Sequence, residues 1–188
     1  MRLEALRGPV GQQSWDDVAM TYALDRAPSP YEVLPPVPSF TLTSQDIQDG
    51  ERMPDRYVRR GGNRSPQLSW SGAPPTTKGY AISIFDPDAP TCCGWWHWFV
   101  LDIPPSVTSV ARGELPRGAY CLRNDFGNYG YDGPAPPPGH GTHRYYIAVH
   151  ALDRGSLGVS ADLPTANGGG SVTGHTLARA VLMSTYSA

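Results

Sequence analysis

The chain has 188 residues, enough for one domain with a flanking segment, and a chain of this length buries a hydrophobic core without disulfides or metals. Its formal net charge of −2 argues against a dedicated nucleic-acid binder, because such proteins carry a basic excess. The first residues lack the apolar run of a secretory signal, and no stretch approaches the roughly 20 apolar residues of a transmembrane helix. The 3 cysteines form no disulfide framework. We therefore expect a cytoplasmic protein without membrane insertion.

The chain opens with what reads as a Pro-rich N-terminal extension, residues 1–38, followed by a domain over residues 39–188. A short helix is predicted over residues 14–20, with Ser14 as its N-cap. The prolines of residues 27–38 favour a stiff, extended backbone. The extension also carries three large aromatic residues, Trp15, Tyr22 and Tyr31. They favour packing against the domain, with a partly ordered tail as the alternative.

The domain alternates short apolar runs with glycines and prolines, which is typical of a β-rich protein with long loops. Strand patterns cover four segments, residues 40–43, 79–85, 95–103 and 143–152. Near the C-terminus, residues 173–183 place Leu177, Val181 and Leu182 on one apolar helical face, after a flexible glycine lead at residues 168–170. The sequence therefore predicts a mainly β fold with a few short helices, including one at the C-terminus.

The first candidate site is the DPDAP run at residues 86–90, directly after a predicted strand. Two acids and two prolines make a rigid turn there, because proline fixes φ and cannot join the ladder. His97 follows on the next strand, among tryptophans. A histidine in that setting is more often a hydrogen-bonded core residue than a ligand. A nearby carboxylate would nevertheless raise its pKa above about 6.5 and favour the imidazolium, a good anion donor.

The second candidate site is the Gly/Pro-rich loop within residues 131–145, which leads into a strand that begins with His143 and Tyr145. Glycines let a ligand approach backbone N–H groups closely, and prolines keep the loop open. Imidazole, phenol and backbone N–H donors suit a phosphate or a carboxylate. A long surface turn without a ligand is the alternative for this segment taken alone.

Taken together, the two segments resemble the phosphatidylethanolamine-binding protein family, also called the Raf kinase inhibitor-like family. The matching runs are DPDAPT at residues 86–91, GWWHW at 94–98, GP at 133–134 and PPPGHGTHRY at 136–145. The runs NDFG at 124–127 and PQLSW at 66–70 resemble the bacterial branch. The resemblance spans about residues 39–186. It implies an antiparallel β-sandwich with an anion pocket at one end.

The resemblance also implies roles for individual residues. The residues expected to contact the ligand are Asp86, His97, His143 and Tyr145, with Gly133 and Pro134 as the loop wall and Trp95 near the rim. The residues expected to hold the turn are Pro87, Asp88 and Pro90. No cofactor is implied. Protein partners, a kinase- or protease-inhibitor-like role and homodimerisation are implied by relatives.

The leading expectation is a protein that binds a phosphate, phosphomonoester, carboxylate or phospholipid head group and has a regulatory role. The alternative is an enzyme that uses Asp86 with His97, and His143 with Tyr145, as acid–base pairs for isomerisation, cyclisation or condensation. A metal site is a third possibility, because His140 and His143 have ligand spacing. We expect no metal, since the two histidines lie across a Gly-Thr turn. The vicinal pair at residues 92–93 is assigned no role.

Overall fold

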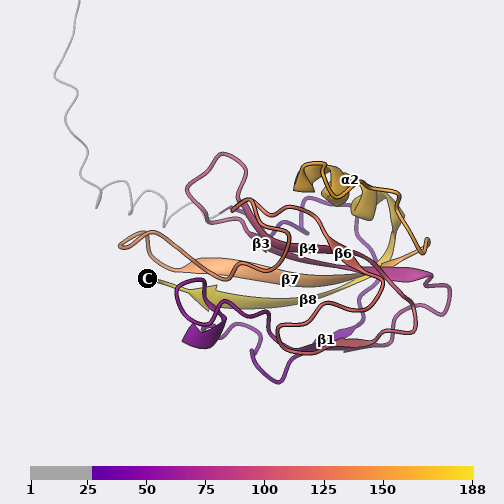
Figure 1. Ribbon diagram of the computed structural model, residues 1–188, viewed down its shortest axis with the longest axis horizontal. Coiled ribbons are helices and arrows are strands. Elements are labelled where there is room, and N and C mark those ends of the chain that lie inside the picture. Colours follow the sequence, from indigo (N-terminus) through magenta and orange to yellow (C-terminus); the bar gives the residue numbers. More distant parts are fainter. Residues whose placement is uncertain (1–26) are drawn as a thin grey trace, which may run out of the picture.

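The computed structural model describes residues 27–188 and shows two antiparallel sheets packed face to face (Figure 1). The predicted helix at residues 14–20, with Trp15 and Tyr22, lies outside the described residues. The large sheet has the strand order β6-β4-β3-β7-β8 and the small sheet the order β1-β2-β5. This arrangement confirms the predicted β-sandwich.

The strands of the large sheet are β3 (Gly79–Asp86), β4 (Trp95–Ile103), β6 (Tyr120–Cys121), β7 (His143–Leu152) and β8 (Thr176–Tyr186). Those of the small sheet are β1 (Thr41–Thr43), β2 (Leu68–Ser71) and β5 (Ser109–Val110). The described residues also contain a 3-10 turn, η1 (Asp55–Tyr57), and one α-helix, α2 (Thr165–His175).

The two faces of the large sheet are both covered, which explains the nearly continuous apolar sequence of its central strands. Alternate residues of β3, such as Ile82 and Ile84, face the small sheet and form the main core with side chains of β4, β7 and β8. On the opposite face, Ala81 belongs to a second core beneath α2, to which the helix contributes Val172. Gly168 lets α2 approach this face, because a Cβ there would lie 2.2 Å from Leu122 Cδ1.

The helix predicted at residues 173–183 is wrong, because most of that segment forms β8. Along β8 the buried residues Ala178, Ala180 and Leu182 alternate with Val181, which is 41% exposed. This period of two fits a strand, and β8 pairs with β7 from Leu152 to His143. The helix lies earlier and includes the glycines expected to be a flexible lead. The ladder with β7, which runs along both strands with one irregularity between Ala151 and Leu152, outweighs the helical periodicity of the segment.

The outer edge of β8 is partly covered by two earlier pieces of the chain. The Arg179 N–H donates to the Pro38 carbonyl over 2.9 Å, next to a parallel bridge between Ser39 and Arg179. Further along the edge, the N–H groups of Gly50 and Met53 donate to the carbonyls of Met183 and Thr185, over 2.7 and 2.8 Å. The edge of the large sheet is therefore bonded to the chain itself at both ends of β8.

The described part of the extension packs on the outer face of the large sheet through Tyr31. The Tyr31 ring meets the edges of Tyr146 and His150, with centroids 6.3 and 6.0 Å apart, and the Arg179 guanidinium lies 4.6 Å from its centre. The Tyr31 hydroxyl is 3.2 Å from the Ser83 hydroxyl. Tyr31 thus anchors residues 27–38 across β3, β7 and β8.

Candidate functional site

The two predicted constellations meet at one end of the large sheet. Asp86 ends β3 and pairs in register with Trp95, the first residue of β4. The neighbouring strand β7 begins at the same end, where Tyr146 lies opposite Phe85. Because antiparallel neighbours place the end of one strand beside the start of the next, side chains far apart in the sequence come together here.

Asp86 is the centre of the site. Its Oδ2 accepts a hydrogen bond from His143 Nδ1 over 2.8 Å, and its Oδ1 accepts one from the Asp88 N–H over 2.8 Å. His97 Nε2 lies 4.0 Å from the same Oδ2. All three side chains are almost completely buried. The carboxylate thus bonds to His143, whereas the acid–base alternative had paired it with His97.

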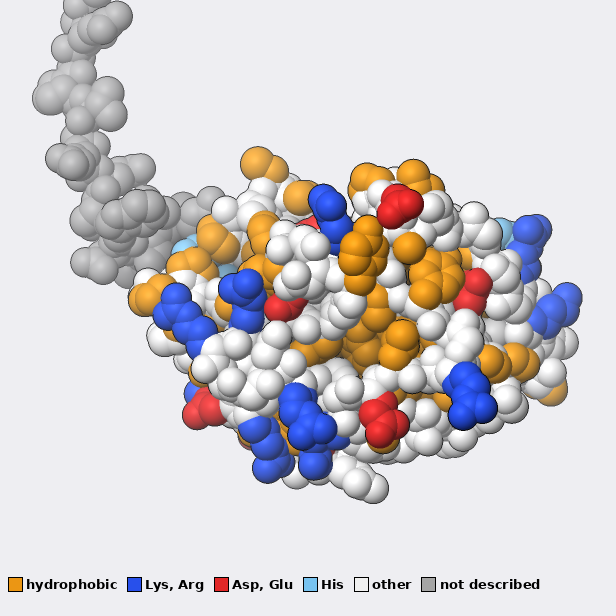
Figure 2. Space-filling model, in the orientation of Figure 1, with side chains coloured by type: hydrophobic (Ala, Val, Ile, Leu, Met, Phe, Trp, Pro, Cys, Tyr) orange, Lys and Arg blue, Asp and Glu red, His pale blue; other side chains and the backbone are white. Residues whose placement is uncertain are grey.

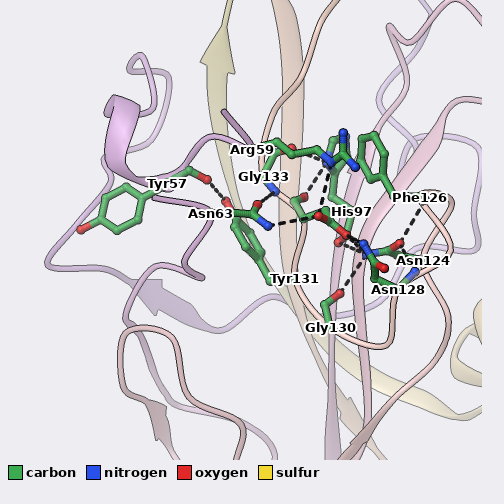
Figure 3. A network of polar contacts seen from close by, with 11 residues as sticks. Tyr57, Arg59, Asn63, His97, Asn124, Phe126, Asn128, Gly130, Tyr131 and Gly133 are labelled. Atoms are coloured by element: carbon green, nitrogen blue, oxygen red, sulfur yellow. Dashed lines mark hydrogen bonds and ion pairs between the residues drawn. The ribbon is translucent and has the colours of Figure 1, made fainter. Parts of the chain in front are cut away.

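His97 is held by backbone carbonyls on its far side (Figure 3). Its Nδ1–H donates to the carbonyls of Asp132 and Gly133, over 2.7 and 3.1 Å, so Nε2 is the nitrogen turned toward Asp86. Burial lowers the pKa of His97 by more than the Asp132 carbonyl and the Asp86 charge raise it. The Asp86 carboxylate therefore raises the pKa of His97 as expected, but burial outweighs this effect and the net shift is downward.

A polar network centred on the buried Asp132 fixes the loop that carries these carbonyls. Figure 3 shows its other members Arg59, Asn63, Asn124 and Asn128. Over 2.7 to 3.4 Å, the Asp132 carboxylate accepts hydrogen bonds from the side chains of Arg59, Asn63, Asn124 and Asn128. Burial alone would raise the pKa of Asp132, but the bonds from the three amides lower it below its ordinary value. Sequence reasoning missed this role, because an acid inside a Gly/Pro-rich loop looks like an ordinary solvated turn residue.

Gly133 and Pro134, which are expected to form the loop wall, lie against the η1 segment and the residues that follow it. A Cβ on Gly133 would be 2.0 Å from the Tyr57 carbonyl oxygen, so only glycine fits there. The Gly133 N–H donates to Asn63 Oδ1 over 2.9 Å, and the Pro134 carbonyl accepts from the Arg59 N–H over 3.0 Å. The loop wall is therefore built from backbone contacts.

Two hydrogen-bond donors in this cluster have no acceptor. Tyr145 is fully buried, its ring stands nearly perpendicular to His97 at 5.1 Å, and its hydroxyl has no partner at good hydrogen-bond geometry, with the Asp86 carboxylate as the candidate acceptor beside it. Burial, followed by the charge of Asp86, raises the pKa of Tyr145, so the phenol stays protonated. The buried indole N–H of Trp95 also has no partner. The Phe126 ring contacts both Trp95 and His97, with ring centroids 5.2 Å and 5.4 Å apart, respectively.

The rigid turn after β3 is clamped to β7 by Asp88. Its carboxylate accepts from Arg144 Nε and Nη2, over 2.7 and 2.6 Å, and from the Arg144 N–H over 2.9 Å. A two-pronged pair of this kind fixes geometry as well as charge. Pro87 and Pro90 flank Asp88 in the same turn, so the structure places all three in the turn itself and leaves Asp86 at the cluster.

His143 has both ring nitrogens engaged, which sequence reasoning did not foresee. Its Nδ1 donates to Asp86, and its Nε2 lies 2.7 Å from His140 Nδ1, a hydrogen-bonding distance. A chain therefore runs from Asp86 through His143 to His140. Within residues 27–188, no group of three or more His, Cys, Asp and Glu side chains is placed to hold a metal ion.

Comparisons with known proteins agree with this architecture. The family model described as phosphatidylethanolamine-binding protein matches residues 43–187. The YbhB protein of Escherichia coli strain K12 is 40% identical over 157 residues, covering 78% of this chain and 99% of YbhB. YbcL of the same organism is 41% identical over 151 residues, covering 74% of this chain and 80% of YbcL.

Solved structures give the same result. The crystal structure of E. coli YbcL, described as a new member of the mammalian PEBP family, has a TM-score of 0.78 and 38% identity and covers 80% of this chain and 99% of its own. The PEBP homologue CT736 of Chlamydia trachomatis has a TM-score of 0.72 and 33% identity, covering 80% of this chain and 98% of its own. Among the described residues, no helix has the length and apolar character needed to cross a bilayer. By sequence and by fold, this chain belongs to the phosphatidylethanolamine-binding protein family, in the bacterial branch that includes YbhB and YbcL.

Proposed function

We propose that the chain binds a small anion, namely a phosphate, a phosphomonoester such as a phospholipid head group, or a carboxylate, at the cluster around Tyr145 and His97. The observation that carries the proposal is the pair of buried donors without acceptors, the Tyr145 hydroxyl and the Trp95 indole N–H. Leaving a buried donor unpaired costs about 1–3 kcal/mol, so a ligand that supplies acceptors to these two groups is favoured by that amount. An anion accepts both bonds.

The protonation state of His97 makes this binding depend on pH. Because burial lowers its pKa, the free protein holds His97 neutral, with the Nε2 lone pair turned toward Asp86. A dianion needs a proton at this position, taken up either by His97 or by the ligand. Affinity should therefore rise as the pH falls, by at most about tenfold per pH unit for one linked proton. Unchanged affinity between about pH 8 and about pH 6 would count against a role for His97.

An anion that enters the cluster must pass the side chains of Phe126 and Arg59. Phe126 contacts both Trp95 and His97, and the Arg59 guanidinium lies 4.3 Å from the centre of the Phe126 ring (Figure 3). The Arg59 side chain is 44% exposed, and its Nε lies 3.4 Å from Asp132 Oδ1, which is long for an ion pair. We propose that these two side chains move aside when the anion enters. Arg59 then brings a positive charge to its rim.

The test is calorimetric titration of phosphate, phosphoethanolamine and acetate into the wild-type protein and two tyrosine variants. Tyr145→Phe removes a hydroxyl that has no partner, so it should leave stability nearly unchanged and weaken anion binding about tenfold or more. Tyr131→Phe is the control, because its hydroxyl donates to the Tyr57 carbonyl over 2.6 Å. It should lower stability by about 1 kcal/mol and leave binding intact. Equal binding by wild type and Tyr145→Phe sinks the proposal.

The proposed role is regulatory, in the manner of a kinase or protease inhibitor, with the bound anion controlling contact between the pocket rim and a protein partner. Family membership is the support for this part. Two chains are also proposed to form a homodimer. Sedimentation velocity with and without phosphate tests the dimer, and a monomer under both conditions rejects it.

An acid–base enzyme is the second candidate, and the hydrogen bond between Asp86 and His143 favours it. A carboxylate that accepts from Nδ1–H orients an imidazole as a general base, which here requires that His143 Nε2 is first released from His140. Measuring catalytic turnover distinguishes the enzyme from the binding protein. Loss of turnover of a carboxylated or phosphorylated metabolite in both Asp86→Asn and His143→Gln, with retained anion binding, would favour the enzyme. Anion binding without turnover would favour the binding protein.

A further inference from the structure

Two adjacent cysteines, Cys92 and Cys93, lie on the connection between β3 and β4, and the proposed function leaves them unused. Both are exposed, whereas an unpaired cysteine is among the residue types most often buried in proteins. In Figure 1 this connection loops away from the sheets at the end where the grey trace stops. Figure 2 shows side chains of the hydrophobic class, which there includes cysteine, on the surface of that end. The two thiols are therefore open to small reagents in solution.

The thiols occupy the middle of a turn that hydrogen bonds to one carbonyl close. Thr91 Oγ1 donates to the Gly94 carbonyl over 2.6 Å, and Cys93 Sγ donates to the same oxygen over 3.9 Å. In a strand, adjacent side chains point to opposite faces, but a turn does not impose this alternation. The backbone at Cys92 and Cys93 therefore allows the two sulfur atoms to approach each other.

A disulfide between adjacent cysteines is easily reversed because it is strained. Consecutive Cα atoms lie about 3.8 Å apart, whereas the Cα atoms of most disulfide-bonded cysteines are about 4.4–6.8 Å apart. Strain makes a disulfide easier to reduce, which is a property of regulatory disulfides. The third cysteine, Cys121, differs from the pair. It is half-buried on β6, and burial raises the pKa of its thiol, which lowers its reactivity.

The turn is coupled to the anion cluster through Gly94. This residue is buried and has a φ of 71°. Its backbone packs so closely that a Cβ would lie 2.3 Å from Phe85 Cζ and 2.8 Å from the Asp86 carbonyl oxygen. The next residue, Trp95, pairs with Asp86 between β4 and β3 and carries the indole N–H on which the proposed function partly rests. A change in the turn therefore reaches both Asp86 and Trp95.

We propose that Cys92 and Cys93 form a thiol–disulfide exchange site, in which a low-molecular-weight disulfide oxidises the pair to a reversible bridge that weakens anion binding at the neighbouring cluster. Ring closure removes the Cys93 S–H that donates to the Gly94 carbonyl and changes the backbone angles of the turn. Gly94 then shifts against Asp86 and displaces the Trp95 indole. The exchange site stands without the proposed function, and only the effect on binding rests on it.

The reaction consists of two exchange steps. The thiolate of one cysteine attacks a sulfur atom of the small disulfide, whose S–S bond breaks, and one small thiolate leaves. The thiolate of the second cysteine then attacks the protein sulfur of this mixed disulfide and releases the second small thiolate. The two protein thiols lose two electrons and two protons, and these convert the small disulfide into two thiols. Excess small thiol reverses both steps.

Peptide mapping tests the exchange. The full-length protein is equilibrated at increasing ratios of glutathione disulfide to glutathione, quenched with acid, alkylated after unfolding and analysed by mass spectrometry. With glutathione disulfide in excess, the peptide that holds Cys92 and Cys93 should lose two hydrogens, take up no alkyl group and return to the dithiol form with dithiothreitol, while Cys121 is still alkylated. Cys92→Ser and Cys93→Ser are the matched controls, since each keeps one thiol of the pair and should retain one bound glutathione. The proposal is overturned if wild type retains glutathione as the single variants do, or if both thiols stay reduced.

Calorimetry with inorganic phosphate tests the effect on the anion cluster. Oxidised wild type should bind phosphate at least about fivefold more weakly than reduced wild type. The double variant Cys92→Ser/Cys93→Ser, treated in the same two ways, should show one affinity. By linkage, saturating phosphate should raise the ratio of glutathione disulfide to glutathione needed for half-oxidation by the same factor. Equal affinities of oxidised and reduced wild type overturn the coupling. Absence of phosphate binding by reduced wild type rejects the proposed function instead, and peptide mapping then decides on the exchange site alone.

Discussion

His150 makes the stability of this fold depend on pH in a defined direction. It is buried on the outer face of the large sheet, where Nδ1 accepts from Arg179 Nε over 3.3 Å and Nε2 donates to the Ser83 hydroxyl over 3.1 Å. Burial, assisted by the neighbouring charge of Arg179, lowers the pKa of His150 to about 3. Tyr31 covers the same site, and because burial raises its pKa to about 12 it stays neutral and offers no compensating charge.

The magnitude follows from proton linkage. An unfolded chain gives His150 a pKa of about 6.5, so below that pH the unfolded state binds more protons than the folded state. The stability contribution is present above about pH 6.5 and is lost as the pH falls toward about 3. With these two pKa values, His150 alone should lower the free energy of unfolding by about 2 kcal/mol between about pH 7 and about pH 5.

Urea unfolding of wild type and His150→Gln at about pH 7 and about pH 5 measures this term. Glutamine retains one acceptor and one donor but does not titrate, so the variant should lose about 2 kcal/mol less than wild type over this interval. The difference between the two proteins cancels other titrating groups, including His97, whose pKa is also lowered. Identical pH dependence in both proteins would refute the assignment to His150.

Three further predictions concern the supports of the site. Asp132→Ala removes the acceptor of three amide side chains, of which Asn124 is buried and Asn63 and Asn128 are exposed, and should lower the free energy of unfolding by about 2 kcal/mol in urea titrations; a loss under about 1 kcal/mol would mean that water replaces the carboxylate. Gly133→Ala drives a Cβ into a backbone carbonyl and should cost several kcal/mol, whereas Gly130→Ala, with nothing within 4 Å, should be nearly neutral; similar melting temperatures for the two variants would contradict the close approach. Arg144→Gln and Asp88→Asn should each cost about 2 kcal/mol, and the double variant should cost much less than their sum; additive losses would show that the two side chains act independently.

The strands that position the site could be predicted because their apolar runs end at glycines and prolines. The expected strands at residues 95–103 and 143–152 coincide with β4 and β7, and the expected strand at residues 79–85 is one residue shorter than β3. The failure at β8 has a different cause. Its period is ambiguous over a short apolar run, and the outcome depends on a partner strand that single-sequence reasoning cannot supply.

The residues that form the site could be predicted from the sequence, but the contacts between them could not. The DPDAP turn and the two histidine-bearing strands identified the residues that meet, but not that Asp86 bonds His143 or that burial keeps His97 neutral. Both depend on distances of a few tenths of an ångström and on desolvation, which appear only after packing. Asp132 was missed for the same reason, because its donors come from three separate segments, at residues 59–63, 124 and 128.

The covered edge of β8 restricts how copies of this protein can assemble. An open sheet edge invites another chain to add a strand, which is a common route to both dimers and aggregates. Here the Arg179 N–H and the carbonyls of Met183 and Thr185 already bond to earlier parts of the same chain. A second copy would have to displace those bonds before it could continue the sheet. The bonds at this edge therefore act as a built-in barrier to strand addition and fibril-like stacking along β8.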